Sequence, residues 1–350
     1  EKLPSKFLEQ KAYGWTMMHL IPKNKNMNTT FLKLIRWKNL FIIILTMIAM
    51  RYAVTQALFS NYKLYLAFPR IGFIFLVLGI VFLFIAGNFI NDYFDRKTDY
   101  INKPLKALLG FKIRRRQMIS LNIIFNILGI ICGFIAAYFA NKLIIGFLFI
   151  FIAAVLWTYS AELKRILFIG NFSLALTIAL IPLSVAITEY FALEHSILQW
   201  EENSIRAIKL SVQLIIGFSI FAFIFTYIRE LVKDCIEYSG DKATGIKSFP
   251  TVIGKRKTDF IISALSLISI TSIILIWEIY LSKLIFFRDY LTAPFYIYAF
   301  IVFPAVLLFL IALTWKASKK HKTMLNLINL IIIFGILFSF IFSLAVYGKI

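Results

Sequence analysis

The sequence predicts an all-α, multi-pass membrane protein in which nine transmembrane helices form one bundle. Three observations support this prediction: 61% of the 350 residues are hydrophobic, only 16% are charged, and long apolar runs recur along the chain. Soluble domains carry about 25% charged residues, so the composition excludes a pair of soluble domains. The apolar runs show no strict alternation of apolar and polar residues, which argues against a β-barrel.

Each predicted span is a run of roughly 20 apolar residues, the length that an α-helix needs to cross a hydrocarbon core about 30 Å thick. All the runs are rich in Ile, Leu and Phe. They cover residues 39–58, 71–90, 117–139, 142–159, 171–190, 208–228, 259–281, 293–315 and 324–347.

The basic residues are divided unevenly between the two sides that nine spans create. The chain has 38 Lys and Arg against 17 Asp and Glu, a formal net charge of +21. Of the basic residues, 29 fall in the N-terminal segment and the loops on its side, and 8 fall on the opposite side. Because cytoplasmic loops carry the excess of Lys and Arg, we expect the N-terminus and the loops at 91–116 and 229–258 to be cytoplasmic, in a protein of the cell (inner) membrane. Since topology accounts for the charge, no nucleic-acid partner is expected.

The first 26 residues differ from the rest of the chain. They begin with Glu1, are rich in lysine, and contain neither an uninterrupted apolar core nor an A-x-A cleavage pattern, so they do not read as a signal peptide. We therefore expect an N-terminal extension of undecided origin at 1–26 and one membrane domain at 27–350. That domain begins with a basic amphipathic segment on the membrane surface.

Among the polar residues within the predicted spans, one in the first span and one in the second are candidates for a role in function. Arg51 lies within the first span and Asn88 within the second. Because a polar side chain in hydrocarbon is costly, Arg51 is expected to face the interior of the bundle. Asn88 is a candidate site residue, since it lies one turn before Asn91. Arg51 is as consistent with an ion pair or snorkelling as with a role in a substrate pocket.

The two cysteines do not define a site by their spacing. Cys132 lies in an apolar run and Cys235 in a charged loop. Two residues so far apart give neither a disulfide framework nor a metal cluster with CxxC spacing. They therefore predict no function.

Two long loops carry acidic residues at the same spacing. The loop after the second span has three acids that are three and then four residues apart, at Asp92, Asp95 and Asp99. The loop after the sixth span repeats this spacing at Asp234, Glu237 and Asp241. Steps of three and four return to one face of an α-helix. Each loop is therefore expected to extend its helix and to present three carboxylates as a stripe.

Three carboxylates on one stripe repel each other unless solvent, basic partners or a divalent cation lies between them. Mg²⁺ takes oxygen ligands and is commonly held by one or two carboxylates together with the phosphates of a substrate. The two stripes are therefore predicted to hold Mg²⁺ and a diphosphate, with basic loop residues neutralising the phosphate oxygens. A solvated charged loop would explain either stripe alone. The repeated spacing in a chain with 17 acidic residues favours a site.

These motifs resemble those of the UbiA superfamily of intramembrane prenyltransferases, whose members carry N-D-x-x-D-x-x-x-D and D-x-x-x-D motifs on two cytoplasmic loops. Residues 91–99 match the first motif, and Glu237 with Asp241 matches the second, where Glu237 stands in place of the usual Asp. Residues 101–105 and 159–171 are similar to further segments of the family. The resemblance extends from about Met27 to the C-terminus and implies the nine-helix fold of the family.

The resemblance also implies the roles of individual residues. Catalysis is expected to depend on four acidic Mg²⁺ ligands, Asp95, Asp99, Glu237 and Asp241. The metal site is expected to include Asn91 as a further ligand, with Asp92 and Asp234 as supporting residues. The expected substrate-binding residues are Asn88, Lys103, Tyr159, Ser160, Lys164, Arg229, Lys233 and Lys247. Tyr159 and Ser160 are equally consistent with an interfacial belt residue and a helix cap.

The function implied by the resemblance is Mg²⁺-dependent transfer of a prenyl group from a polyprenyl diphosphate, such as geranylgeranyl diphosphate, to a lipophilic acceptor in the bilayer. The segment 229–250 looks most like the branch resembling digeranylgeranylglyceryl phosphate synthase, whose acceptor is a prenylated glycerol phosphate. The alternatives are an aromatic acceptor of quinone synthesis, a chlorophyllide, or a non-catalytic binder or transporter of polyprenyl phosphate. The oligomeric state and the prenyl chain length are not predicted.

Overall fold

The computed structural model describes residues 35–102, 114–196, 202–279, 305–306, 308–312, 316 and 319–347. Every regular element in these ranges is a helix, and they contain no strand. The predicted all-α class is therefore confirmed. The extension 1–26, Lys103 and most of the predicted eighth span lie outside the described residues.

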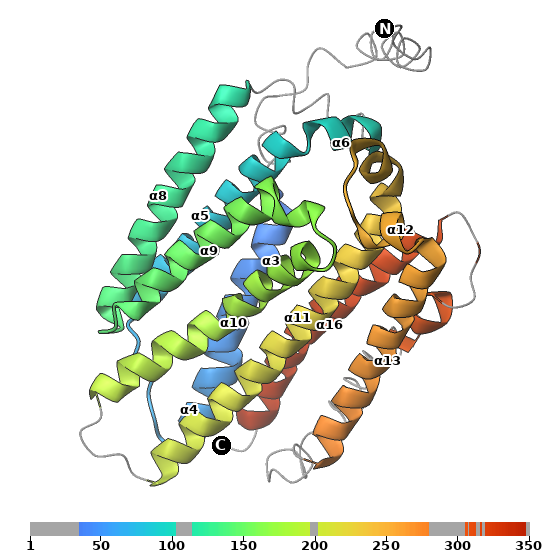
Figure 1. Ribbon diagram of the computed structural model, residues 1–350. Helices are drawn as coiled ribbons and strands as arrows, with labels where there is room; N and C mark the ends of the chain where they lie inside the picture. The colour runs from blue at the N-terminus through green and yellow to red at the C-terminus, as the bar shows by residue number, and fades with distance from the viewer. Residues whose placement is uncertain are drawn as a thin grey trace, which may run out of the picture.

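Long helices lie side by side in one bundle (Figure 1). The first, α3 (Trp37–Ile48), continues through the π-helix η1 (Ala49–Gln56) into α4 (Ala57–Asn61). The other long helices are α5 (Arg70–Phe94), α8 (Arg115–Phe139), α9 (Ile144–Ala161), α10 (Ile169–Ser196), α11 (Glu202–Thr244), α13 (Lys255–Ile279) and α16 (Lys320–Tyr347). Three short helices, α6 (Arg96–Asn102), η2 (Leu163–Arg165) and α12 (Phe249–Val252), complete the list.

Among the described residues, seven helices are long and apolar enough to cross a membrane. They are Trp37–Asn61, Arg70–Phe94, Arg115–Phe139, Ile144–Ala161, Ile169–Glu194, Ile205–Thr244 and Lys320–Leu344. These correspond to the first six predicted spans and the ninth, and α13 overlaps the predicted seventh. The described residues therefore contain seven candidate spans, and the count of nine stays a prediction.

The outside of the bundle is apolar. Ile124, Phe147 and Phe260 are 50%, 57% and 67% exposed, whereas Met47 and Phe149 inside the bundle are fully buried. Contiguous apolar surface of this extent is unfavourable in water. It is the surface expected of helices whose outer faces contact lipid.

Arg51 lies in the π-helix η1 and is 1% exposed, so it faces the interior of the bundle as predicted. Its Nη2 donates to the carbonyl oxygen of Phe68 at 2.5 Å, and its guanidinium lies 4.5 Å from the centroid of the Phe73 ring. Glu189 accepts a hydrogen bond from the backbone N–H of Phe68 at 3.2 Å. Arg51 therefore packs against the segment that leads into α5. This segment lies at the end of α5 opposite the acidic motif.

The second acidic motif lies on one unbroken helix. α11 has 43 residues, a length of about 65 Å at 1.5 Å per residue. A hydrocarbon core is only about 30 Å thick, so α11 extends well beyond it. Asp234, Glu237 and Asp241 lie in this extension, and the predicted helical stripe is confirmed for the second motif.

The first acidic motif is divided between two helices, contrary to the prediction of one continuous stripe. α5 ends at Phe94, Asp95 caps it, and α6 begins at Arg96 and runs across the end of the bundle (Figure 1). The Asp95 N–H still donates to the Asn91 carbonyl oxygen at 2.9 Å. The helical hydrogen bonding therefore persists up to the break, which explains why residue spacing does not reveal it.

Candidate active site

The two acidic motifs meet through Asn102 at the end of α6. The Asn102 side chain donates to the carbonyl oxygen of Glu237 at 2.9 Å and accepts from the N–H of Gly240 at 2.9 Å. One turn earlier, the hydroxyls of Thr98 and Thr244 lie 3.3 Å apart. One amide therefore joins the first motif to the backbone of the second, 135 residues further along the chain.

Gly240 allows this close contact between α6 and α11. A Cβ atom added at Gly240 would lie 2.4 Å from Nδ2 and 2.8 Å from Oδ1 of Asn102. Both distances are shorter than van der Waals contact permits. The absence of a side chain at this position therefore allows the Asn102 amide to lie directly against the backbone of α11.

The motif side chains are buried despite their charge. Six of them are at most 9% exposed, namely Asn91, Asp92, Asp95, Asp99, Glu237 and Asp241. Oδ1 of Asp241 is buried and has no hydrogen-bond partner among the described residues. A buried carboxylate oxygen without a partner costs free energy, and a hard cation would satisfy it. The oxygen-rich set fits Mg²⁺, with Asp95, Asp99, Glu237 and Asp241 available as ligands.

Lys164 brings a positive charge between the two motifs. Its Nζ lies 2.5 Å from Oδ2 of Asp95. Burial lowers the pKa of the Lys164 ammonium, but neighbouring carboxylates, chiefly Asp95 and then Glu237, raise that pKa above its ordinary value. Lys164 is therefore charged at neutral pH. An ammonium in this position can bind either a carboxylate or a phosphate oxygen.

A tight connection places Lys164 there. Lys164 lies in the short helix η2, and Phe168 adopts a left-handed conformation with φ 72° before α10 begins. Gly170 packs against this turn, because an added Cβ would lie 2.7 Å from the carbonyl oxygen of Leu163. The turn between α9 and α10 is therefore compact, and it directs Lys164 toward Asp95.

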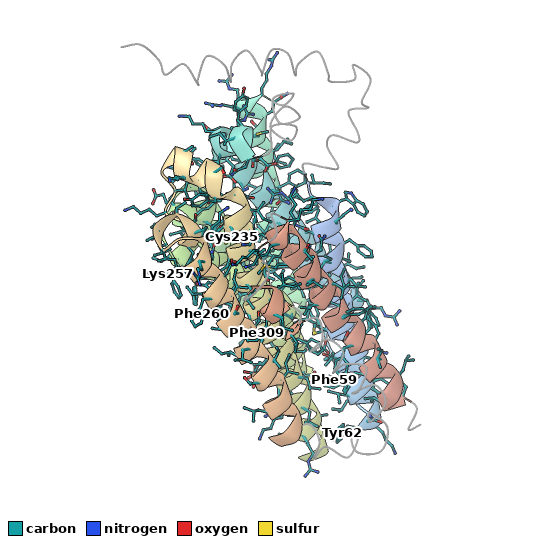
Figure 2. The ribbon with its side chains drawn as sticks, turned by 90° about the vertical axis from the view of Figure 1, so that its right-hand side faces the viewer. Phe59, Tyr62, Cys235, Lys257, Phe260 and Phe309 are labelled. Carbon is teal, nitrogen blue, oxygen red and sulfur yellow. The ribbon has the colours of Figure 1, made fainter. Side chains whose placement is uncertain are left out.

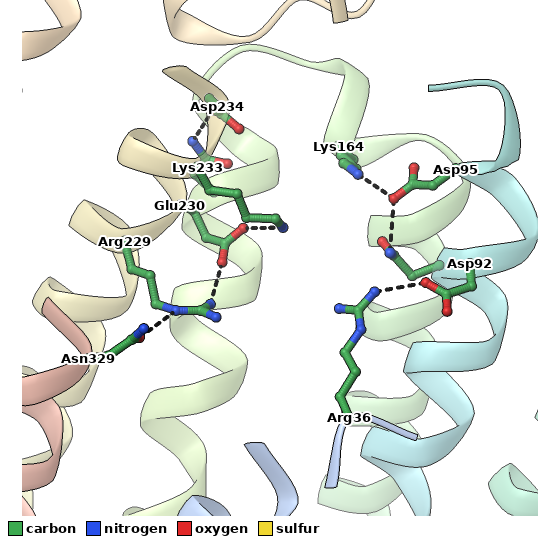
Figure 3. A network of polar contacts seen from close by, with 11 residues as sticks. Arg36, Asp92, Asp95, Lys164, Arg229, Glu230, Lys233, Asp234 and Asn329 are labelled. Atoms are coloured by element: carbon green, nitrogen blue, oxygen red, sulfur yellow. Dashed lines mark hydrogen bonds and ion pairs between the residues drawn. The ribbon is translucent and has the colours of Figure 1, made fainter. Parts of the chain in front are cut away.

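The first motif is supported by its neighbours (Figure 3). Nη2 of Arg36, just before α3, donates to Oδ1 of Asp92 at 2.8 Å. The Asn91 amide donates to Oδ2 of Asp95 at 2.9 Å, the same oxygen that Lys164 contacts. With the amide nitrogen of Asn91 so engaged, its oxygen is the atom that could act as a ligand.

The second motif is preceded by a buried network around Glu230, which is 2% exposed (Figure 3). Glu230 accepts from Nη1 of Arg229 at 2.8 Å and from Nζ of Lys233 at 2.9 Å. Arg229 also donates to the Asn329 side chain of α16 at 3.3 Å. The two predicted phosphate-binding cations are therefore held in place by one carboxylate.

Asp234 differs from the other acids of its stripe. Its carboxylate accepts a hydrogen bond at 2.9 Å from Asn171 at the start of α10. This contact joins α11 to α10. Asp234 is thus occupied with a helix contact, and its supporting role at a metal stays a prediction.

The remaining predicted substrate-binding residues occupy different environments. Tyr159 is buried at the end of α9, and the hydroxyl of Ser160 donates to the carbonyl oxygen of Leu156 in its own helix. The Asn88 amide donates to the carbonyl oxygen of Ile35 at 3.0 Å, so it holds the segment before α3. Lys247 is exposed in the loop between α11 and α12.

Four residues of the site were not predicted to belong to it: Arg36, Asn102, Asn171 and Glu230. Asn102 and Asn171 lie in segments that resemble the family, but spacing gives no reason to select them. Glu230 carries a detectable signal, because an acid directly after Arg229 and three residues before Lys233 is spaced for a helical ion pair. Arg36 contacts Asp92 across 56 residues, which only the tertiary structure reveals.

The fold and the site together define an intramembrane protein built around two facing acidic motifs. The model of the UbiA prenyltransferase family matches residues 57–331. The chain therefore belongs to that family. The seven long apolar helices and the family membership identify it as an integral membrane protein.

Several archaeal proteins named digeranylgeranylglyceryl phosphate synthase are similar in sequence. The protein of Methanobrevibacter smithii is 29% identical over 271 residues, which cover 77% of this chain and 85% of the relative. The protein of Pyrococcus horikoshii is 29% identical over 187 residues, and that of Korarchaeum cryptofilum 32% over 191. The matched parts cover 53% and 54% of this chain but only 58% and 59% of those two relatives.

Solved structures share the fold. A structure described as concerning digeranylgeranylglyceryl phosphate synthase in membranes is 22% identical, with a TM-score of 0.57 over 90% of this chain and 98% of that one. A UbiA homolog from Archaeoglobus fulgidus bound to DMAPP and Mg²⁺ is 15% identical, with a TM-score of 0.55 over 90% and 99% of the chains. At these identities the likeness shows the fold.

Proposed function

We propose that this protein transfers a prenyl group from a polyprenyl diphosphate, such as geranylgeranyl diphosphate, to the alcohol oxygen of a prenylated glycerol phosphate. The observation that carries the proposal is the contact between two buried acidic motifs at one end of an apolar bundle, with Lys164 between them. The names of the archaeal relatives support the glycerol phosphate acceptor.

The reaction breaks the bond between the allylic carbon and the diphosphate oxygen, and the electron pair leaves with the diphosphate. The acceptor oxygen then bonds to that carbon and loses its proton, which gives an ether. In apolar surroundings the departing diphosphate must be neutralised, so most of the catalysis is electrostatic. Mg²⁺ held by Asp95, Asp99, Glu237 and Asp241 would supply positive charge there.

The chain's own cations complete this neutralisation. Lys164 pairs with Asp95 at 2.5 Å and can turn to a phosphate oxygen from the same position. Arg229 and Lys233 are both held by Glu230, which positions their charges before the substrate arrives. Cations positioned in advance require little reorganisation during the reaction. The apolar helices around them exclude water from the reactive cation.

The proposal is tested by incubating the protein in detergent with geranylgeranyl diphosphate and either a geranylgeranylated glycerol phosphate or an aromatic acid. We expect a Mg²⁺-dependent ether product from the glycerol phosphate, identified by mass, and equimolar release of diphosphate. An aromatic product alone would instead support a quinone-precursor prenyltransferase. Binding of the diphosphate without any product from either acceptor would support a non-catalytic polyprenyl phosphate binder.

We further propose that the protein is one membrane domain, residues 27–350, with nine spans and with its motif loops and N-terminus on the cytoplasmic side of the cell (inner) membrane. The distribution of Lys and Arg supports this orientation. Lys242 lies near the end of α11 beside the second motif, and Lys142 lies between α8 and α9 at the other end of the bundle.

The orientation predicts opposite accessibility for these two exposed lysines. We expect Lys142→Cys to react with a membrane-impermeant thiol reagent in intact cells, and Lys242→Cys to react only after the cells are opened. Both native cysteines are buried, so the wild-type protein gives the background level of labelling. Rapid labelling of Lys242→Cys in intact cells would reverse the proposed orientation.

A further inference from the structure

A second group of metal-ligating side chains lies on a different face of α11 from the acidic stripe. The Sγ of Cys235, a carboxylate oxygen of Asp259 and a ring nitrogen of His321 all lie within 4.8 Å of one another. They come from three helices, α11, α13 and α16. At 100° per residue, Cys235 is about 160° from Glu237 and about 120° from Asp241 around the axis of α11. The group is therefore separate from the Mg²⁺ site.

We propose that Cys235, Asp259 and His321 form a Zn²⁺ site that joins α11 to α13 and α16. A thiolate, an imidazole and a carboxylate are the ligands that zinc takes in proteins. Mg²⁺ prefers oxygen ligands alone, and the sulfur and nitrogen donors therefore select a transition metal. Three protein ligands leave a fourth position for water or hydroxide.

The distances agree with this assignment. Ligand atoms that lie about 2.0–2.3 Å from a tetrahedral zinc ion are about 3.3–3.8 Å from one another. His321 Nε2 and Asp259 Oδ1 are 2.9 Å apart, so these two atoms are already near enough to bind the same zinc ion. The three ligand atoms lie within 4.8 Å of one another, so binding requires movements of only about 1 Å.

Lys320 orients the carboxylate from outside the group. Its Nζ donates to Oδ2 of Asp259 at 2.7 Å and to the carbonyl oxygen of Ala312 at 2.7 Å. Oδ1 of Asp259 is thereby directed toward His321. Hydrogen bonds that fix a ligating carboxylate in this way are common around protein metal sites. Zinc with one thiolate and one carboxylate is neutral, and a hydroxide in the fourth position would offset the charge of Lys320.

The site has a structural consequence for the second motif. Figure 2 shows Cys235 well away from Phe59 and Tyr62, which lie toward the other end of the bundle. Cys235 is two residues before Glu237 on the same rigid helix. A metal that holds Cys235 to α13 and α16 would therefore fix the rotation of α11 and the direction in which Glu237 and Asp241 point.

The test is zinc binding by the full-length chain in detergent. We expect the wild-type protein to retain one zinc per chain after dialysis and to melt at a higher temperature with zinc than without it. Cys235→Ser and His321→Gln should each bind zinc at least about tenfold more weakly. Cobalt in place of zinc should produce the near-ultraviolet absorption of a cobalt–thiolate bond, and Cys235→Ser should abolish it.

Two matched variants locate the metal. Cys132→Ser removes the other buried cysteine, and Asp95→Asn alters the Mg²⁺ site, so both should retain zinc as the wild type does. Loss of zinc in Asp95→Asn with retention in Cys235→Ser would assign it to the acidic motifs and overturn the proposal. A wild-type chain that retains no zinc would overturn it too. If Cys235→Ser does not fold, His321→Gln and the cobalt spectrum decide the question.

Discussion

Asp241→Asn is expected to lower the rate of prenyl transfer by about 100- to 1000-fold while leaving the protein at least as stable as the wild type. The rate falls because one negatively charged oxygen ligand is lost where charge must be neutralised, and a single such contribution is worth about that much. Stability does not fall because Oδ1 of Asp241 is buried and has no hydrogen-bond partner among the described residues. A neutral amide costs less to bury there than a carboxylate.

The measurement is diphosphate release over a range of Mg²⁺ concentrations, together with the melting temperature in the same detergent. Glu162→Gln is the matched control, since Glu162 is an exposed carboxylate two residues from Lys164. It should keep both the rate and the Mg²⁺ dependence of the wild type. Equal rates for Asp241→Asn and Glu162→Gln would show that Asp241 is not a metal ligand. A lower melting temperature for Asp241→Asn would show that the carboxylate stabilises the fold.

The features that depend on local spacing could be predicted from the sequence. The runs of apolar residues locate all seven candidate spans of the described residues, because the hydrocarbon thickness sets the length of a span. Steps of three and four place Glu237 and Asp241 on one face of α11. The break at Asp95 could not be predicted in this way, because Asp92 and Asp99 keep helical spacing across it.

The features that depend on distant contacts could not be predicted. Asn102 contacts residues on another helix that lie 135 and 138 positions away. Cys235 meets Asp259 and His321 only because three helices converge. No short-range pattern marks such groups, and the spacing of the two cysteines gives no sign of this one. The contacts between motifs are therefore where the structure adds most to the sequence.

Gly240→Ala is expected to lower prenyl transfer by about 100-fold through geometry alone, since it changes no charge and no ligand. The new Cβ would lie 2.4 Å from Nδ2 of Asn102, so the Asn102 side chain or the whole of α6 must move. Either movement breaks the hydrogen bonds of Asn102 with Glu237 and Gly240, and the first motif is then no longer tied to the second. A displacement of about 1 Å at a catalytic site costs about 100-fold in rate.

Gly217→Ala makes the same substitution on the same helix, at a position where an added Cβ meets nothing within 4 Å. It should keep full activity and should slightly stabilise α11, because alanine favours a helix by about 1 kcal/mol over glycine. Asn102→Ala removes the same two hydrogen bonds without adding an atom, so its loss of rate should match that of Gly240→Ala. If Gly240→Ala is as active as Gly217→Ala, the contact between α6 and α11 does not set the distance between the motifs. If only Asn102→Ala loses activity, the hydrogen bonds of Asn102 matter and the close approach at Gly240 does not.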